Sequence, residues 1–166
     1  YFFSYLYLWA VSPDVWAPGN APGPPTLAYP WGSAALFLAG ALILYFSGRA
    51  LPAPGRKNAV TSLALLSAPL VMAAALALEV HGHIQSGLDP TASSYGAMVY
   101  MAAFLTGQAA LASAVLCWFA LARHLTGQLD SYRRATFDNA RLLYWYTAAQ
   151  GLFGLLLIHG FPRLIG

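Results

Sequence analysis

Four long stretches of the chain consist almost entirely of apolar residues, and they restrict the fold more than any other feature of the sequence. They cover residues 31–51, 59–80, 95–121 and 142–161. A helix needs about 20 mostly apolar residues to cross the hydrocarbon core of a bilayer, so each stretch predicts a transmembrane helix. The opening run, residues 1–11, is too short to span alone, and its many aromatic residues suit a membrane interface. We therefore expect an all-α, polytopic membrane bundle of four full transmembrane helices plus the end of a fifth at the N-terminus.

The charged residues are too few to cover a water-soluble globule. They make up 8% of the 166 residues, and hydrophobic residues make up 59%, whereas a soluble domain has about 25% charged residues. This composition excludes a soluble enzyme and a nucleic-acid-binding protein. The length predicts one domain, a single transmembrane bundle over residues 1–166. Cys117 is the one cysteine, and its apolar surroundings predict a packing role.

The basic residues are distributed unevenly between the connections. Of the eight Lys and Arg residues, only Arg163 lies outside two alternating segments. The positive-inside rule places those two segments on the cytoplasmic side, and the C-terminus on the opposite side. The seven residues are Arg49, Arg56 and Lys57 in the first segment, and Arg123, Arg133, Arg134 and Arg141 in the second.

Small residues recur at helical spacing in the third and fourth apolar stretches. Helices associate in lipid through such residues and through a few polar side chains. Gly107 and Gly151 are therefore predicted at helix–helix contacts, where replacement by Leu would overpack the bundle. Gln108 and Gln150 lie at membrane depth, and we expect their amides to find hydrogen-bond partners inside the bundle.

The candidates for chemistry are isolated side chains. His81 or His83, at the outer end of the second stretch, could in principle ligate a haem b together with His159. Glu79 is the one acid near membrane depth, where a carboxylate is a functional hypothesis by default; we favour a simple contact with His83, four residues later. The sequence contains no metal-binding or phosphate-binding motif, so we expect a supporting subunit without a catalytic or metal site of its own.

Several segments, taken in order, resemble subunit III of the haem–copper cytochrome c oxidases. Residues 3–10, Phe-Ser-Tyr-Leu-Tyr-Leu-Trp-Ala, resemble the third helix of that family, and residues 15–18, Val-Trp-Ala-Pro, resemble the Trp-Pro-Pro of the following external loop. Residues 94–100 resemble the Tyr-Gly-Ser-x-Phe-Phe that opens the sixth helix, and residues 121–125 resemble its end. Residues 143–149 resemble the start of the last helix.

The chain departs from the family at its polar membrane residues. Tyr5 stands where the family has a glutamate in the third helix, and Thr106-Gly107-Gln108-Ala109 stands for a His-Gly-x-His in the sixth. Tyr146 and Ala149 replace a His and an Asp in the seventh. These losses resemble a divergent bacterial member, of the kind in which subunits I and III are fused in one polypeptide.

The resemblance implies that the chain corresponds to helices three to seven of subunit III. Such a subunit binds no haem or copper; these lie in the partner catalytic subunits. It contacts oxidase subunits I and II, binds phospholipid, and supports sustained oxygen reduction coupled to proton pumping. Arg123 is the candidate contact for a lipid phosphate. The expected location is the bacterial inner membrane, with the C-terminus on the periplasmic side.

Two other interpretations stay open. One is the haem-b protein, which needs His159 to face a histidine of another helix. The other is a small transporter or assembly-factor bundle, which needs a polar cavity at mid-membrane and interrupted helices. Pro69 could kink the second helix, although no matching interruption occurs elsewhere.

Overall fold

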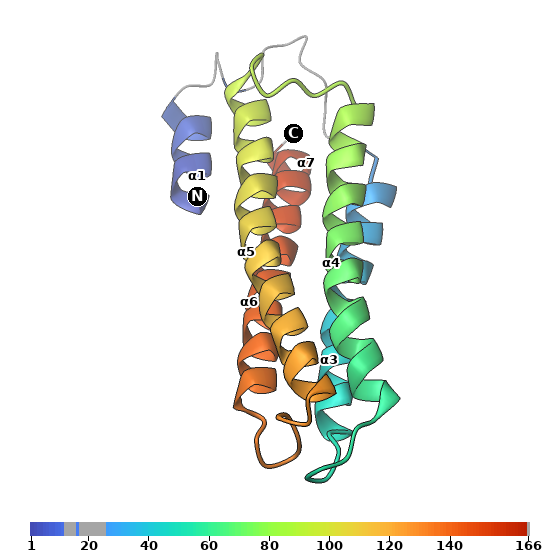
Figure 1. Cartoon of the computed structure of the whole chain (residues 1–166). Helices are drawn as coiled ribbons and strands as arrows, with labels where there is room; N and C mark the ends of the chain where they lie inside the picture. Colours follow the sequence, from blue (N-terminus) through green and yellow to red (C-terminus); the bar gives the residue numbers. More distant parts are fainter. Residues whose placement is uncertain (12–15, 17–25, 166) are drawn as a thin grey trace.

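The computed structural model describes residues 1–11, 16 and 26–165, and the regular elements in this part of the chain are all helices, joined by short connections (Figure 1). Four helices are long and apolar enough to cross a membrane, as the sequence predicts. In chain order the elements are α1 (Phe2–Val11), α3 (Ala28–Arg49), α4 (Ala59–Gln85), α5 (Ser94–Leu125), α6 (Ala135–Leu155), the π-helical turn η1 (Leu156–Gly160) and α7 (Phe161–Ile165).

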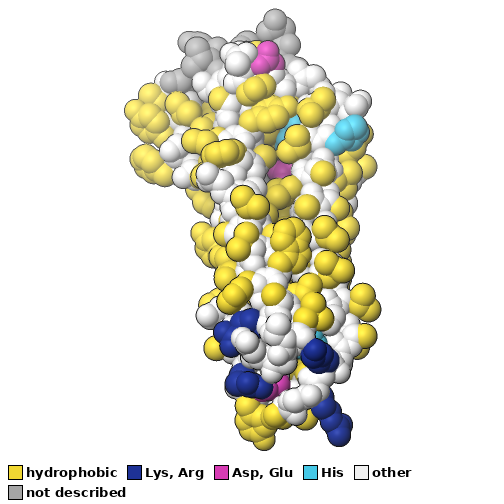
Figure 2. All heavy atoms as spheres, in the orientation of Figure 1, with side chains coloured by type: hydrophobic (Ala, Val, Ile, Leu, Met, Phe, Trp, Pro, Cys, Tyr) yellow, Lys and Arg dark blue, Asp and Glu magenta, His cyan; other side chains and the backbone are white. Residues whose placement is uncertain are grey.

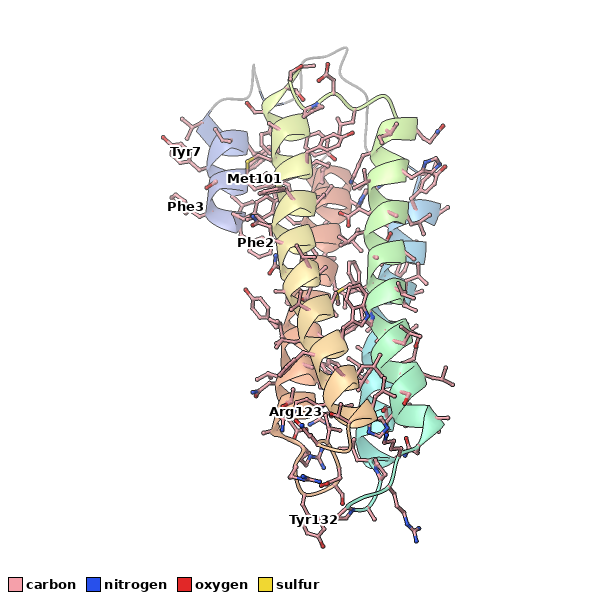
Figure 3. All side chains as sticks on the ribbon, in the orientation of Figure 1. Phe2, Phe3, Tyr7, Met101, Arg123 and Tyr132 are labelled. Carbon is pink, nitrogen blue, oxygen red and sulfur yellow. The ribbon has the colours of Figure 1, made fainter. Side chains whose placement is uncertain are left out.

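The helices α3 to α6 form a closed bundle. α3 packs on α4, α4 on α5, α5 on α6, and α6 packs back on α3, with neighbours running in opposite directions (Figure 1). The short helix α1 contacts α5 and lies beside only one half of the bundle. Its side chains Phe3 and Tyr7 point away from the bundle (Figure 3).

Each of the four long helices extends beyond the apolar stretch that predicted it, and α3 already begins at Ala28. α4 continues to Gln85 and α5 to Leu125, and each is followed by a glycine with positive φ, Gly87 at 72° and Gly127 at 73°. Glycine adopts this left-handed conformation without steric cost and so ends helices efficiently. α6 begins at Ala135, seven residues before the predicted start at 142. Polar sequence therefore stays helical beyond the expected membrane boundary.

The two ends of the bundle differ in charge. The seven basic residues of the alternating segments gather at one end, which we call the basic end (Figure 2). The opposite end carries His81 and His83 in the last turns of α4 and His159 in η1, and we call it the histidine end. The observed separation matches the alternation of basic segments in the sequence.

Two apolar clusters fill the interior. The larger one runs through α3 to α6, and within it Gly151 of α6 faces the ring of Phe37 in α3; a Cβ at this glycine would lie 2.8 Å from that ring. Gly40 of α3 lies against the hydroxyl of Tyr144, and the latter donates a hydrogen bond to the Ala68 carbonyl at 2.9 Å. The smaller cluster joins α1 to α5 and η1 around Tyr5.

Hydrogen bonds organise the basic end. Asn58 caps α4 by accepting from the Thr61 N–H at 2.7 Å, a bond that satisfies one of the free donors of the first turn. The buried ring of His124 lies 3.2 Å from the Asn58 carbonyl oxygen and 3.5 Å from that of Leu129. Asp130, also buried, accepts from the guanidinium of Arg133 at 2.6 Å. These contacts tie the two basic connections together.

Candidate functional site

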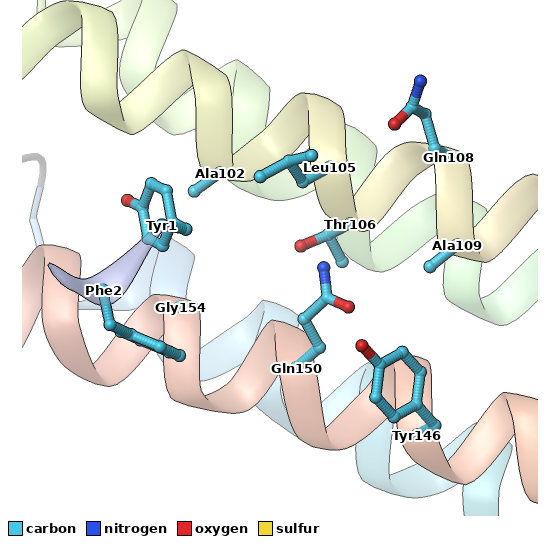
Figure 4. Close-up of a pocket in the computed structure, with 10 residues that line it drawn as sticks. All are labelled: Tyr1, Phe2, Ala102, Leu105, Thr106, Gln108, Ala109, Tyr146, Gln150 and Gly154. Carbon is cyan, nitrogen blue, oxygen red and sulfur yellow. The ribbon is translucent and has the colours of Figure 1, made fainter. Parts of the chain in front are cut away.

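A groove of about 580 Å³ runs between α1, α5 and α6 (Figure 4). It starts where α1 begins and follows the exposed seam between α5 and α6, which no other described helix covers. We call it the polar groove. Its lining residues are Tyr1, Phe2, Ala102, Leu105, Thr106, Gln108, Ala109, Tyr146, Gln150 and Gly154.

The polar side chains of this groove are its chemically informative part. Thr106 and Gln150 lie opposite each other across it, and Tyr146 is 62% exposed (Figure 4). Within the described chain, Gln108, Gln150 and the Tyr146 hydroxyl make no side-chain hydrogen bond. Polar groups at membrane depth cost free energy unless they are satisfied, so this seam is suited to a covering partner.

This placement corrects the expectation that both glutamine amides bond inside the bundle. The buried face of α5 passes through Thr106 and Ser113, and Gln108 lies about 200° around the helix from Thr106, because each residue turns about 100°. The bond that does cross the α5–α6 seam joins Ser113 Oγ and Thr147 Oγ1 at 3.0 Å. Small polar residues at helical spacing were the signal that could have identified this pair.

The two glycines predicted at helix contacts have different surroundings. Gly151 has the close approach to Phe37 described above. Gly107 is half-buried, and a Cβ there would meet no described atom within 4 Å. The small-residue stripe of α5 therefore includes a position that no described helix contacts. Gly154 has equally open space and lines the polar groove.

Arg123 lies at the basic end of α5 (Figure 3). Its Nη2 donates to the Gln128 carbonyl at 3.4 Å, and its Nε is buried without a partner in the described chain. The side chain is half-buried in the last turn of α5, and an arginine at the end of an apolar helix can extend its guanidinium towards headgroups.

The histidine end brings together three side chains that the sequence analysis considered. The rings of His83 and His159 stack with centroids 5.3 Å apart and planes 5° apart, and His83 Nε2 lies 3.9 Å from Glu79 Oε1. His81 is exposed and packs on Tyr29 instead. Stacked rings do not direct their nitrogens at one iron between them, so this pair lacks the arrangement that a shared haem requires.

The remaining candidates are a metal site, the proline within α4 and the single cysteine. Among the described residues, no group of three His, Cys, Asp or Glu side chains is arranged to hold a metal ion. α4 continues through Pro69 without interruption, so that proline does not create the broken helix typical of many transporters. Cys117 is a free, buried thiol in the larger core cluster.

The four apolar helices define a multi-pass helical membrane protein, and a groove with several polar side chains lies between α1, α5 and α6. No protein-family model matches the chain, and no curated protein matches it significantly.

Proposed function

We propose that this protein is a non-catalytic accessory subunit of a respiratory haem–copper oxidase, equivalent to helices three to seven of subunit III. The observation that carries the proposal is the polar groove. It presents unbonded glutamine amides at membrane depth along an uncovered seam, which is the surface expected of a bundle that works in a larger membrane complex.

The packing of the resembling segments supports the same assignment. The ring centroids of Tyr5 and Trp16 lie 4.8 Å apart. Tyr5 belongs to the segment that resembles the third helix, and Trp16 belongs to the external-loop segment. The ring centroid of Trp16 in turn lies 5.7 Å from that of Tyr95, which lies at the start of the segment resembling the sixth helix. Three segments that are separate in the sequence thus meet in one cluster. If this bundle shares the helix packing of the family, these aromatic contacts would be kept even where the polar membrane residues differ.

The proposal assigns the chemistry to other chains. Haem and copper lie in the catalytic subunits I and II, which this bundle supports during oxygen reduction coupled to proton pumping. Phospholipid binds at its surface, with Arg123 facing a phosphate on the side of the basic end. By the positive-inside rule that end faces the cytoplasm of a bacterial inner membrane, and the C-terminus faces the periplasm.

The test is purification of the full chain through a tag in mild detergent, followed by a subunit gel and a reduced-minus-oxidised spectrum. We expect a large partner and a-type haem bands, both of which are lost when this chain is stripped away. A b-type spectrum that stays with the isolated chain would replace the proposal with a haem-b protein. No haem and no large partner would favour a transporter or assembly factor.

A groove variant sharpens this experiment. Gly154→Leu fills the polar groove without meeting a described atom at its Cβ, so we expect a folded bundle that recovers at least about tenfold less partner. Ala112→Leu, at an exposed position of α5 outside the groove lining, is the matched control. A loss of about 1.4 kcal/mol of binding free energy corresponds to that factor. Equal partner recovery from both variants would exclude the groove as the interface.

A further inference from the structure

Three ionisable side chains are buried together at the histidine end. Glu79 is 4% exposed, His83 is not exposed and His159 is 3% exposed. Glu79 and His83 lie one turn apart on α4, and His159 comes from the π-helical turn η1 near the end of the chain. Such turns occur frequently at functional sites.

None of the four imidazole nitrogens has a hydrogen-bond partner among the described residues. The Glu79 carboxylate lies 3.9 Å from His83, and the two rings stack. A buried polar group is normally bonded, and each exception calls for an explanation. Here the exceptions are adjacent, and all of them can gain or lose a proton.

The groups that face this trio come from every neighbouring element. Tyr100 of α5 lies 6.2 Å from the His83 ring, and Tyr95 donates to the Ile158 carbonyl. Tyr1 lies close enough to Glu79 to interact electrostatically. Arg163 of α7 donates to the His159 carbonyl at 2.7 Å and interacts electrostatically with His159.

Charge balance determines what the trio can hold. With no titrating proton the site contains a buried carboxylate, and with two it contains a net buried cation; each isolated charge carries a desolvation cost of several kcal/mol. A single proton, on Glu79 or as an imidazolium beside the carboxylate, leaves the trio neutral. We propose that Glu79, His83 and His159 form a binding site for one exchangeable proton within the membrane-spanning bundle.

The ring nitrogens of His159 are buried, but the residue borders a groove on the surface. This second groove, of about 460 Å³, lies between the start of α3 and the end of α6. A proton from water or from a hydroxyl-bearing molecule would reach a ring nitrogen of His159 when this end of the bundle opens locally. Because the stacked rings do not point their nitrogens at each other, its passage to His83 and Glu79 also needs a rotation of one ring. No electron moves, and the donor keeps the bonding pair. This inference is independent of the oxidase assignment.

The four histidines allow a direct test. The full chain, labelled with ¹⁵N at the histidine rings, is placed in phosphatidylcholine nanodiscs and titrated by NMR. We expect His83 and His159 to titrate as a coupled unit, apart from the exposed His81. Glu79→Gln changes the proton affinity of His83 by at least about tenfold, the effect of a charge at this separation. Asp89→Asn, the exposed acid at the same end, leaves both curves unchanged.

Two controls keep the test decisive. His124, hydrogen-bonded at the basic end, reports whether each variant is folded. If Glu79→Gln changes the NMR signals of His124, the variant is not folded and His159→Phe is used in its place. His159→Phe keeps an aromatic ring stacked on His83 but removes the titratable group that is coupled to it. His83 and His159 curves that are independent, or unchanged in the folded variants, would overturn the proposal. Stoichiometric binding of Zn²⁺ to both rings would replace it with a metal site.

Discussion

His124 at the basic end and His83 at the histidine end are both fully buried imidazoles, yet only His124 has hydrogen-bond partners in the described chain. The same contrast holds for tyrosine. Tyr144, in the larger core cluster, donates to the Ala68 carbonyl, whereas the buried Tyr5 hydroxyl of the smaller cluster has no described partner. In each of these two pairs one polar group is bonded and the other has no described partner, although Ser47 Oγ, Thr61 Oγ1 and Arg123 Nε at the basic end are also buried without one.

Buried polar groups with and without hydrogen-bond partners should affect the stability of the bundle differently. A bonded buried group fixes one arrangement of the helices, and its loss leaves the partner unpaired. A buried group without a partner carries an uncompensated desolvation cost, so its removal should leave stability unchanged or raise it. Matched substitutions at the two ends measure this distinction directly.

The largest effect is expected from the buried histidines. His124→Phe removes the ring's contacts with Asn58 and Leu129. It should lower the free energy of unfolding by about 1–3 kcal/mol, the cost of one buried unpaired group, because a neutral imidazole donates one hydrogen bond. His159→Phe removes nitrogens that have no described partner, so it should leave the free energy of unfolding unchanged or raise it. Reversible unfolding in mixed micelles measures both. Equal costs would mean that the two ends do not differ.

A smaller effect is expected from the tyrosine hydroxyls. Tyr144→Phe removes the 2.9 Å bond to Ala68 and should cost about 1 kcal/mol, the usual net value of one hydrogen bond. Tyr5→Phe keeps the ring against Trp16 and removes only the unbonded hydroxyl, so its stability should equal or exceed that of the parent. The same unfolding measurement checks both variants. A Tyr5→Phe cost above that of Tyr144→Phe would contradict the contrast.

The sequence predicted the basic end better than the histidine end, for physical reasons. Hydropathy and the alternation of arginines depend only on composition along the chain, so the spans and their charged connections could be read directly. The stacking of His83 on His159 joins residues 76 positions apart through a π-helical turn, which no local pattern specifies. Likewise, Gly107 and Gly151 look alike in a small-residue stripe, and only the neighbouring helix distinguishes them.

The smallest effect is expected from the acids in the connections. The Asp130 carboxylate at the basic end accepts hydrogen bonds from the backbone N–H of Arg133 and from the Arg133 guanidinium. These bonds lower the pKa of Asp130, and the backbone bond is the larger cause. Asp89 at the histidine end accepts from the N–H and hydroxyl of Thr91, which also lower its pKa. Each carboxylate therefore contributes stability that is complete above the unfolded pKa of about 3.9 and is lost as the pH falls through the lower folded value.

Asp130→Asn and Asp89→Asn measure these two contributions by thermal unfolding at several pH values. Asp130→Asn should lower the Tm at pH 7, and the deficit should shrink below about pH 4, because the parent then loses the same bonds. Asp89→Asn should have a smaller effect, because Asp89 is exposed and bonds only to Thr91 in its own loop. Asp130 is buried and holds Tyr132 and Arg133 beside the His124 network. A larger deficit for Asp89→Asn would place the main polar anchor at the histidine end and reverse the comparison.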